Sequence, residues 1–193
     1  MSTSSSISSS RFTLSRLVWA VMRFVLSVLV VLIWASCGGG GGGTALEPDQ
    51  IDAFVAAHNE ARAAVLPAPD PALPPLEFDA ELAATAQQWS ARCLFEHSEG
   101  TGLGENLAIF SGAESTPEDV VDAWASENAF FDYDANTCAN GEQCGHYTQI
   151  VWRETARVGC GVSSCNFAEL GGEGLFWVCN YDPPGNFIGE RPY

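Results

Sequence analysis

The spacing of hydrophobic residues predicts three helices in the first two thirds of the chain. The first spans Glu47–Leu66 and has Pro48 near its start, where the first turn of a helix tolerates proline. The second runs from Asp79, a residue type that caps helices, through Phe95. The third begins at Thr116, and its first turn holds a proline and two acids. One face of this third helix carries Val120, Trp124, Glu127 and Phe131.

After Cys144 the pattern changes to runs of β-branched and aromatic residues, which are typical of strands. These runs predict strands at Tyr147–Trp152, Arg157–Ser163 and Leu175–Tyr181, and His146 would stand at the head of the first strand. Helices early in the chain and strands later indicate an α+β domain, in which helices pack on an antiparallel sheet. The sequence shows neither an internal repeat nor a second domain.

The first 36 residues have the layout of a secretory signal. Three arginines precede an apolar run, Phe24–Ala35, and small residues follow it. The run is too short to cross a bilayer core of about 30 Å, and extending it backwards would bury Arg23. We therefore predict that residues 1–36 form a signal peptide that is cleaved.

Cys37 stands directly after this signal, behind Ala35 and Ser36, and the arrangement resembles the lipobox of bacterial lipoproteins. Trp34 departs from that pattern, which usually has leucine there. The sequence thus predicts lipid attachment at Cys37 and a membrane anchor, with ordinary cleavage nearby and free secretion as the alternative. Polyglycine follows, and residues 37–46 would form a flexible tether in front of a domain over residues 47–193.

Beyond Cys37 the chain is strongly acidic. All 24 Asp and Glu residues lie there with five of the eight arginines, which gives a net charge of −19. Such a surface repels nucleic-acid backbones and anionic lipid head groups. We expect no nucleic-acid partner.

Six cysteines within the domain are enough for three disulfides in an oxidising compartment. They are Cys93, Cys138, Cys144, Cys160, Cys165 and Cys179. Together with the signal, they indicate an extracellular or cell-envelope location.

The candidate chemistry lies in the three histidines, His58, His97 and His146, and in two acids, Glu105 and Glu127. Glu127 falls on an otherwise apolar helix face, where a carboxylate is desolvated unless it is paired. Histidine with carboxylate can bind zinc or a similar ion, or can act as an acid/base pair. No HExxH-like spacing places two ligands on one helical turn. The competing interpretation is that these residues are polar core residues whose hydrogen bonds are satisfied within the fold.

Several short motifs in order along the chain resemble the signatures of the CAP superfamily, which joins cysteine-rich secretory proteins, antigen 5 and pathogenesis-related 1 proteins. The motifs are His58–Arg62, Gly104–Ala108, Trp124–Glu127, Gly145–Trp152 and Cys179–Asn186. The resemblance covers about Gln50 to Tyr193 and is strongest to the plant pathogenesis-related branch, down to the final Gly-Glu-Arg-Pro-Tyr. A bacterial lipoprotein or a secreted member of this superfamily is the expectation.

The resemblance implies an α-β-α sandwich with a central sheet between helical layers. It also implies a cleft lined by His97, Glu105, Glu127 and His146, in which the two histidines bind Zn2+ or another divalent cation. His58 is outside that set, and we expect it to hydrogen-bond within the helix packing.

The plant branch further implies the disulfides Cys93–Cys165, Cys138–Cys144 and Cys160–Cys179. The insertion Phe167–Gly174 lengthens the stretch before Cys179 relative to that branch. The resemblance therefore does not fix the local geometry around the Cys160–Cys179 pair.

Three functions are compatible with these features. The favoured one is a binding module for a lipid, a sterol or another small ligand, of the defence or signalling type. The alternative is a zinc-dependent hydrolase or protease, with Glu105 or Glu127 as the base. The third is a structural envelope protein, in which the four residues form a polar network that stabilises the fold.

Overall fold

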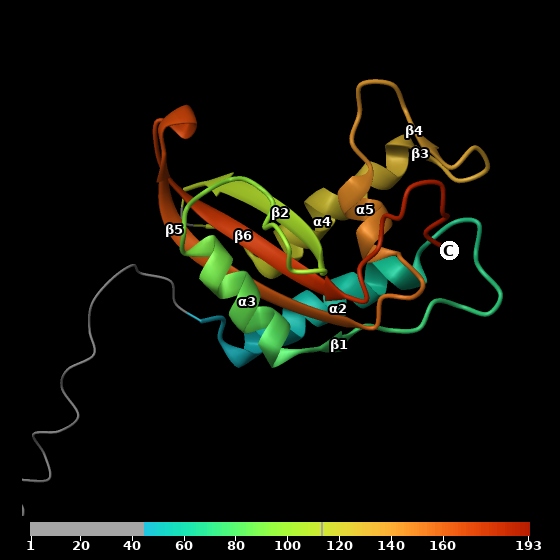
Figure 1. Ribbon diagram of the computed structural model, residues 1–193, viewed down its shortest axis with the longest axis horizontal. Helices are drawn as coiled ribbons and strands as arrows, with labels where there is room; N and C mark the ends of the chain where they lie inside the picture. The colour runs from blue at the N-terminus through green and yellow to red at the C-terminus, as the bar shows by residue number, and fades with distance from the viewer. Residues whose placement is uncertain (1–44, 113) are drawn as a thin grey trace, which may run out of the picture. The chain divides into compact units, whose positions relative to one another are not determined.

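A computed structural model describes residues 45–112 and 114–193 (Figure 1). The predicted signal peptide and the lipid attachment at Cys37 fall outside these residues and stay predictions. Within the described ranges, no helix has the length and apolar character needed to cross a lipid bilayer.

The described residues form four helices and a four-stranded sheet. The helices are α2 (Pro48–Ala63), α3 (Ala80–Ser90), α4 (Pro117–Ala125) and α5 (Gly145–Ile150), with short 3-10 turns at η1 (Ser126–Phe130) and η2 (Ala168–Leu170). The sheet has the order β1-β5-β6-β2, from β1 (Glu77–Phe78), β5 (Arg157–Phe167), β6 (Gly172–Asp182) and β2 (Gly104–Ser111). A separate pair joins β3 (Phe131–Asp132) to β4 (Thr137–Cys138).

The sheet is mixed rather than wholly antiparallel as predicted. Strands β5, β6 and β2 are antiparallel, whereas the two-residue β1 runs parallel to β5. Helices cover both faces (Figure 1). On one face Phe54 of α2 and Val120 of α4 pack with Trp177 and Tyr181 of β6. On the other face Ala86 of α3 packs with the residues of β6 that point the opposite way. The α-β-α sandwich is therefore confirmed.

Helix α3 lies directly on the backbone of β5 because two glycines leave room for it. A Cβ atom at Gly159 would stand 2.1 Å from the backbone nitrogen of Ala83, and one at Gly161 would stand 2.5 Å from the Cα atom of Gln87. Both distances are far below any van der Waals contact. A glycine inside a strand often marks such a close backbone approach.

The predicted strand Tyr147–Trp152 is wrong, because most of this segment is helix α5. Two side chains from elsewhere favour the helix over the local β propensity. The carboxylate of Glu127 accepts hydrogen bonds from the backbone N–H groups of His146 and Tyr147. At the other end, the buried guanidinium of Arg62 donates to the carbonyl oxygens of Ile150 and Trp152, both at 2.8 Å.

Other boundaries also differ from the prediction. The second helix ends at Ser90 rather than Phe95, and Cys93 beyond it has a φ of 54°, which an α-helix excludes. The third helix changes to the 3-10 turn η1 after Ala125, and this turn carries Glu127. Strand β2 was not predicted at all, although it contains Glu105.

The three disulfides of the structure are those that the resemblance implies. Cys93–Cys165 ties the segment after α3 to β5, and Cys138–Cys144 joins β4 to the start of α5. Cys160–Cys179 connects directly opposite residues of β5 and β6. The insertion Phe167–Gly174 forms the end of the β5–β6 hairpin around η2, so it leaves this pairing in register.

We predict that Gly159→Ala destabilises the fold by about 1–3 kcal/mol or more, because the added methyl group overpacks the contact between β5 and α3. Denaturant unfolding measures the change. Gly172→Ala is the matched control, since a Cβ at Gly172 meets no atom within 4 Å. Equal effects of the two substitutions would contradict the close packing of α3 on β5.

Candidate functional site

Glu127 holds both the start of α5 and the ring of His146. Its Oε2 accepts from the N–H groups of His146 and Tyr147 at 2.9 and 3.1 Å. Its Oε1 lies 2.6 Å from Nδ1 of His146. Burial of the Glu127 carboxyl opposes ionisation, but the hydrogen bonds from His146 and from the N–H of Tyr147 outweigh it and lower the pKa of Glu127. An ionised carboxylate can only accept, so the Nδ1 atom of His146 carries the proton.

The ring of His146 is also fixed by stacking. The indole of Trp124 on α4 lies nearly parallel to it, with ring centroids 5.9 Å apart and an angle of 24° between the planes. The indole nitrogen of Trp124 donates to the carbonyl oxygen of Leu107 on β2, 3.3 Å away. The imidazole is therefore oriented from two sides, by a carboxylate at its edge and by an aromatic ring at its face.

The second histidine has the same kind of partner. His97 lies between α3 and β2, and its Nδ1 is 2.8 Å from Oε1 of Glu105. Ser98 supports the same carboxylate, since its N–H donates to Oε1 at 2.9 Å and its hydroxyl donates to Oε2 at 2.7 Å. The side chain of Glu105 is only 6% exposed, whereas that of His97 is 66% exposed. A buried acid thus orients an accessible imidazole.

Both histidines line one cavity of about 320 Å³. The full lining is His97, Glu105, Asn106, Gln143, Cys144, Gly145, His146 and Asn186. Glu127 is not among the lining residues and reaches the cavity only through His146. The structure therefore brings the four residues of the implied cleft together as two pairs, His97 with Glu105 and His146 with Glu127.

The donor set fits a metal held by two imidazoles. In each pair the carboxylate engages Nδ1, which leaves Nε2 as the remaining ring nitrogen. Histidines that bind metals commonly donate their other ring N–H to a carboxylate in this way. Among the described residues, however, no three His, Cys, Asp or Glu side chains group closely enough to hold an ion. A cation between His97 and His146 would therefore keep water or ligand groups in its other positions.

A chain of buried hydrogen bonds links α2 to the site. Nδ1 of His58 donates to the carbonyl of Phe54 at 2.7 Å, and Nε2 accepts from the hydroxyl of Tyr181 at 2.9 Å. The side-chain amide of Asn106 then donates to that hydroxyl and to the carbonyl of His146, each at 3.1 Å. His58 itself is fully buried and lies outside the cavity. Burial lowers the pKa of His58 to about 4, so the ring is neutral near pH 7.

Several residues of the site were not singled out from the sequence. Asn106 lies within the motif Gly104–Ala108, but nothing in the sequence indicates that its side-chain amide contacts the backbone of His146. Ser98 follows His97, and its hydrogen bonds to Glu105, seven residues later, are not visible in the sequence. Gln143 and Asn186 line the cavity, but their positions in the sequence follow no pattern that identifies them as site residues.

Comparison with known proteins identifies the family. Residues 55–181 match the Cysteine-rich secretory protein family, CAP. The chain is 46% identical over 144 residues to Pathogenesis-related protein 1A of Nicotiana tabacum, covering 72% of this chain and 79% of that protein. It is 42% identical over 161 residues to GLIPR1-like protein 1 of Mus musculus, covering 78% and 66%. The chain therefore belongs to the CAP family, as its motifs predicted.

Solved structures agree with this assignment. NaASP2, whose crystal structure was solved with Zn2+, aligns with a TM-score of 0.63 at 26% identity over 80% of this chain and 90% of its own. Venom allergen-like protein 4 of Schistosoma mansoni aligns with a TM-score of 0.59 at 30% identity over 77% and 95%. None of these relatives supports a bacterial lipoprotein.

We predict that Glu127→Gln destabilises the protein by about 1–2 kcal/mol, because a neutral amide accepts weaker hydrogen bonds from the N–H groups of His146 and Tyr147 and pairs with Nδ1 only if the imidazole changes tautomer. Denaturant unfolding of metal-free protein measures the loss. Glu142→Gln serves as the control, since Glu142 is exposed. If both variants unfold at the same denaturant concentration, Glu127 does not hold the start of α5.

We predict that stability falls by about 3 kcal/mol between pH 6.5 and pH 4 through His58 alone. The unfolded chain protonates this histidine below about pH 6.5, but the folded protein does so only below about pH 4, so acid favours unfolding in that window. Unfolding free energies measured across it for the protein and for His58→Gln test this. An equally steep pH dependence in the variant would rule out His58 as the source.

Proposed function

We propose that this protein is a secreted binding module whose cavity holds a divalent cation, with zinc as the first candidate, between His97 and His146. One observation carries the proposal. Two imidazoles line the same cavity, and each has its Nδ1 atom engaged by a carboxylate, so that Nε2 is the nitrogen left to bind a metal. The similarity to NaASP2, which was solved with Zn2+, supports the choice of metal.

The two acids act as positioning residues in this proposal. Glu105 and Glu127 each accept three hydrogen bonds from neighbouring groups. They set the tautomer and the direction of each ring, and they add negative charge that favours a cation nearby. A bound metal would supply a site for an anionic or neutral oxygen of a ligand.

The same contacts favour binding over hydrolysis. A zinc hydrolase needs a base that can take a proton from the metal-bound water. Both candidate bases, Glu105 and Glu127, already accept hydrogen bonds from the histidines and from neighbouring groups. The pKa of Glu127 is also lowered rather than raised toward neutrality. This argues against Glu105 and Glu127 as catalytic bases.

The lining of the cavity supports a polar ligand. Imidazoles, a carboxylate and three side-chain amides surround it, and a lipid or sterol placed there would bury apolar surface against these groups. A lipid, if the protein binds one, would need a different surface. Such a lipid site and the membrane anchor at Cys37 both stay proposals.

We place the protein outside the cytoplasm, in the extracellular space or the cell envelope. Three disulfides within one small domain form and persist in oxidising compartments. The family takes its name from secretory proteins, which supports the same location.

Calorimetric titration of chelator-treated protein with Zn2+ tests the proposal. We expect one ion per chain, and at least tenfold weaker binding for His97→Ala and for His146→Ala. Glu105→Gln should weaken binding by about tenfold, because it removes the acceptor that orients His97.

Gln143→Ala is the matched control, since Gln143 lines the cavity but has no metal-binding group of this kind. Its affinity for zinc should equal that of the unaltered protein. Zinc binding that survives in the double variant His97→Ala with His146→Ala would sink the proposed site, as would no zinc binding at all.

A further inference from the structure

The outer edge of β5 is covered in pieces by different groups. The short strand β1 pairs only with Arg157 and Val158. Just after β1, the N–H of Asp79 donates to the carbonyl of Val158 at 2.9 Å. Helix α3 begins there, and no further strand continues along β5 in the described residues.

Farther along the same edge, a side chain substitutes for a strand. Nε2 of Gln87 donates to the carbonyl of Val162 at 2.9 Å, and Oε1 of Gln87 accepts from the N–H of Val162 at 3.1 Å. A carboxamide thus makes the two hydrogen bonds that a neighbouring strand residue would make. The backbone groups at this edge of β5 can therefore hydrogen-bond to an amide group that is not part of a strand.

Cys160 lies between these two covered positions. Backbone groups of alternate strand residues point to the same edge, so the N–H and C=O of Cys160 point the same way as those of Val158 and Val162. The Cα atoms of Cys160 and Cys179 are 4.1 Å apart, as in a pair that does not share hydrogen bonds across the β5–β6 ladder. None of the described residues hydrogen-bonds to the backbone of Cys160 at this edge.

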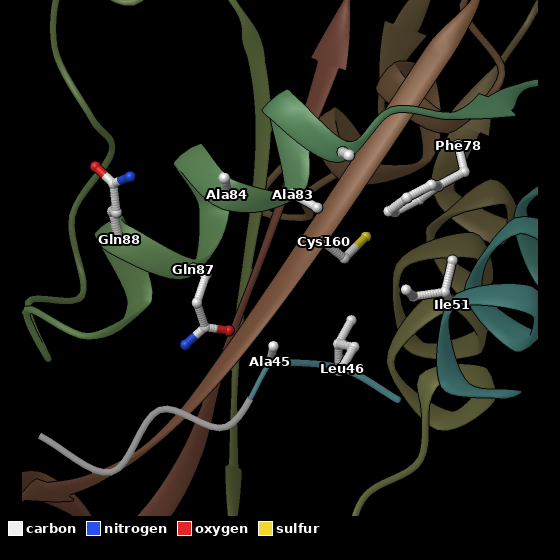
Figure 2. A pocket seen from close by; sticks show the side chains of 10 residues that line it. Ala45, Leu46, Ile51, Phe78, Ala83, Ala84, Gln87, Gln88 and Cys160 are labelled. Carbon is white, nitrogen blue, oxygen red and sulfur yellow. The ribbon is translucent and has the colours of Figure 1, made fainter. Parts of the chain in front are cut away.

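The same position opens into a cavity of about 450 Å³ (Figure 2). It is lined by Ala45, Leu46, Ile51, Phe78, Ala80, Ala83, Ala84, Gln87, Gln88 and Cys160. Figure 2 shows Phe78 and Ile51 on one side of Cys160 and Ala83 and Ala84 of α3 on the other. None of these residues carries a charge. The volume is ample for one large aliphatic side chain, and a charged one would be desolvated without a partner.

We propose that this cavity binds an extended peptide segment of a partner protein, which pairs one residue with the backbone of Cys160 and inserts its aliphatic side chain. The peptide would fill the gap in the edge between β1 and Gln87. Main-chain hydrogen bonds with a pocket for one side chain are a recurring mode of peptide recognition. The cavity shares no residue with the histidine cavity, so this site stands or falls independently of metal binding.

The minimal probe is N-acetyl-leucine N-methylamide, which offers one extended residue with its own N–H and C=O. Titration of the ¹⁵N-labelled protein, followed by NMR, should give saturable shifts of the Cys160 backbone N–H and of the Gln87 side-chain NH₂. The glycine analogue should bind at least tenfold more weakly, because it leaves the cavity empty. The ester analogue of the leucine probe, which lacks the N–H, should bind about tenfold more weakly.

Ala84→Phe fills the cavity from the exposed face of α3 and should weaken binding of the leucine probe at least tenfold. Ala91→Phe makes the same change at an exposed alanine at the end of α3, outside the cavity, and should leave binding unchanged. If the ester binds as well as the amide, the cavity takes apolar ligands without strand pairing, and the proposal is overturned. No saturable shift, or equal affinities of the two variants, also overturns it.

Discussion

Helix α5 has only six residues and depends on groups from other elements at both of its ends. An isolated helix shorter than about 12 residues is marginal in water, because each end leaves backbone groups without partners. Here the carboxylate of Glu127 satisfies N–H groups at the start. The guanidinium of Arg62 satisfies carbonyl groups at the end. Since α5 carries His146, the site depends on this arrangement.

A buried chain of hydrogen bonds also links the position of helix α5 to residues in the core. His58, Tyr181 and Asn106 come from α2, β6 and β2, and each is almost completely buried. A polar group in such a position is costly unless it is paired, so each of these residues restricts where the next can lie. The chain ends on the carbonyl of His146, which couples the position of α5 to the packing of α2 on the sheet.

Structure that depends on residues adjacent in the sequence could be predicted from it. Structure that depends on contacts between residues far apart in the sequence could not. Thr116 accepts a hydrogen bond from the N–H of Asp119, so the start of the third helix was visible in adjacent residues. The segment after Cys144 was interpreted as a strand because the partners that make it a helix lie about 20 and about 90 residues away. The resemblance named the four residues of the cleft, but only the structure assigns each histidine to its own glutamate.

Glu127 stabilises the start of helix α5 and also orients the ring of His146. These two roles affect the order in which the two residues could be replaced during evolution. If His146 binds a metal as proposed, a lineage that no longer needed the metal could replace the imidazole and keep the backbone N–H, which Glu127 would still hold. Replacing Glu127 first would weaken the fold as well. Relatives that have lost the site should therefore retain the acid more often than the histidine, as a remnant of its architectural role.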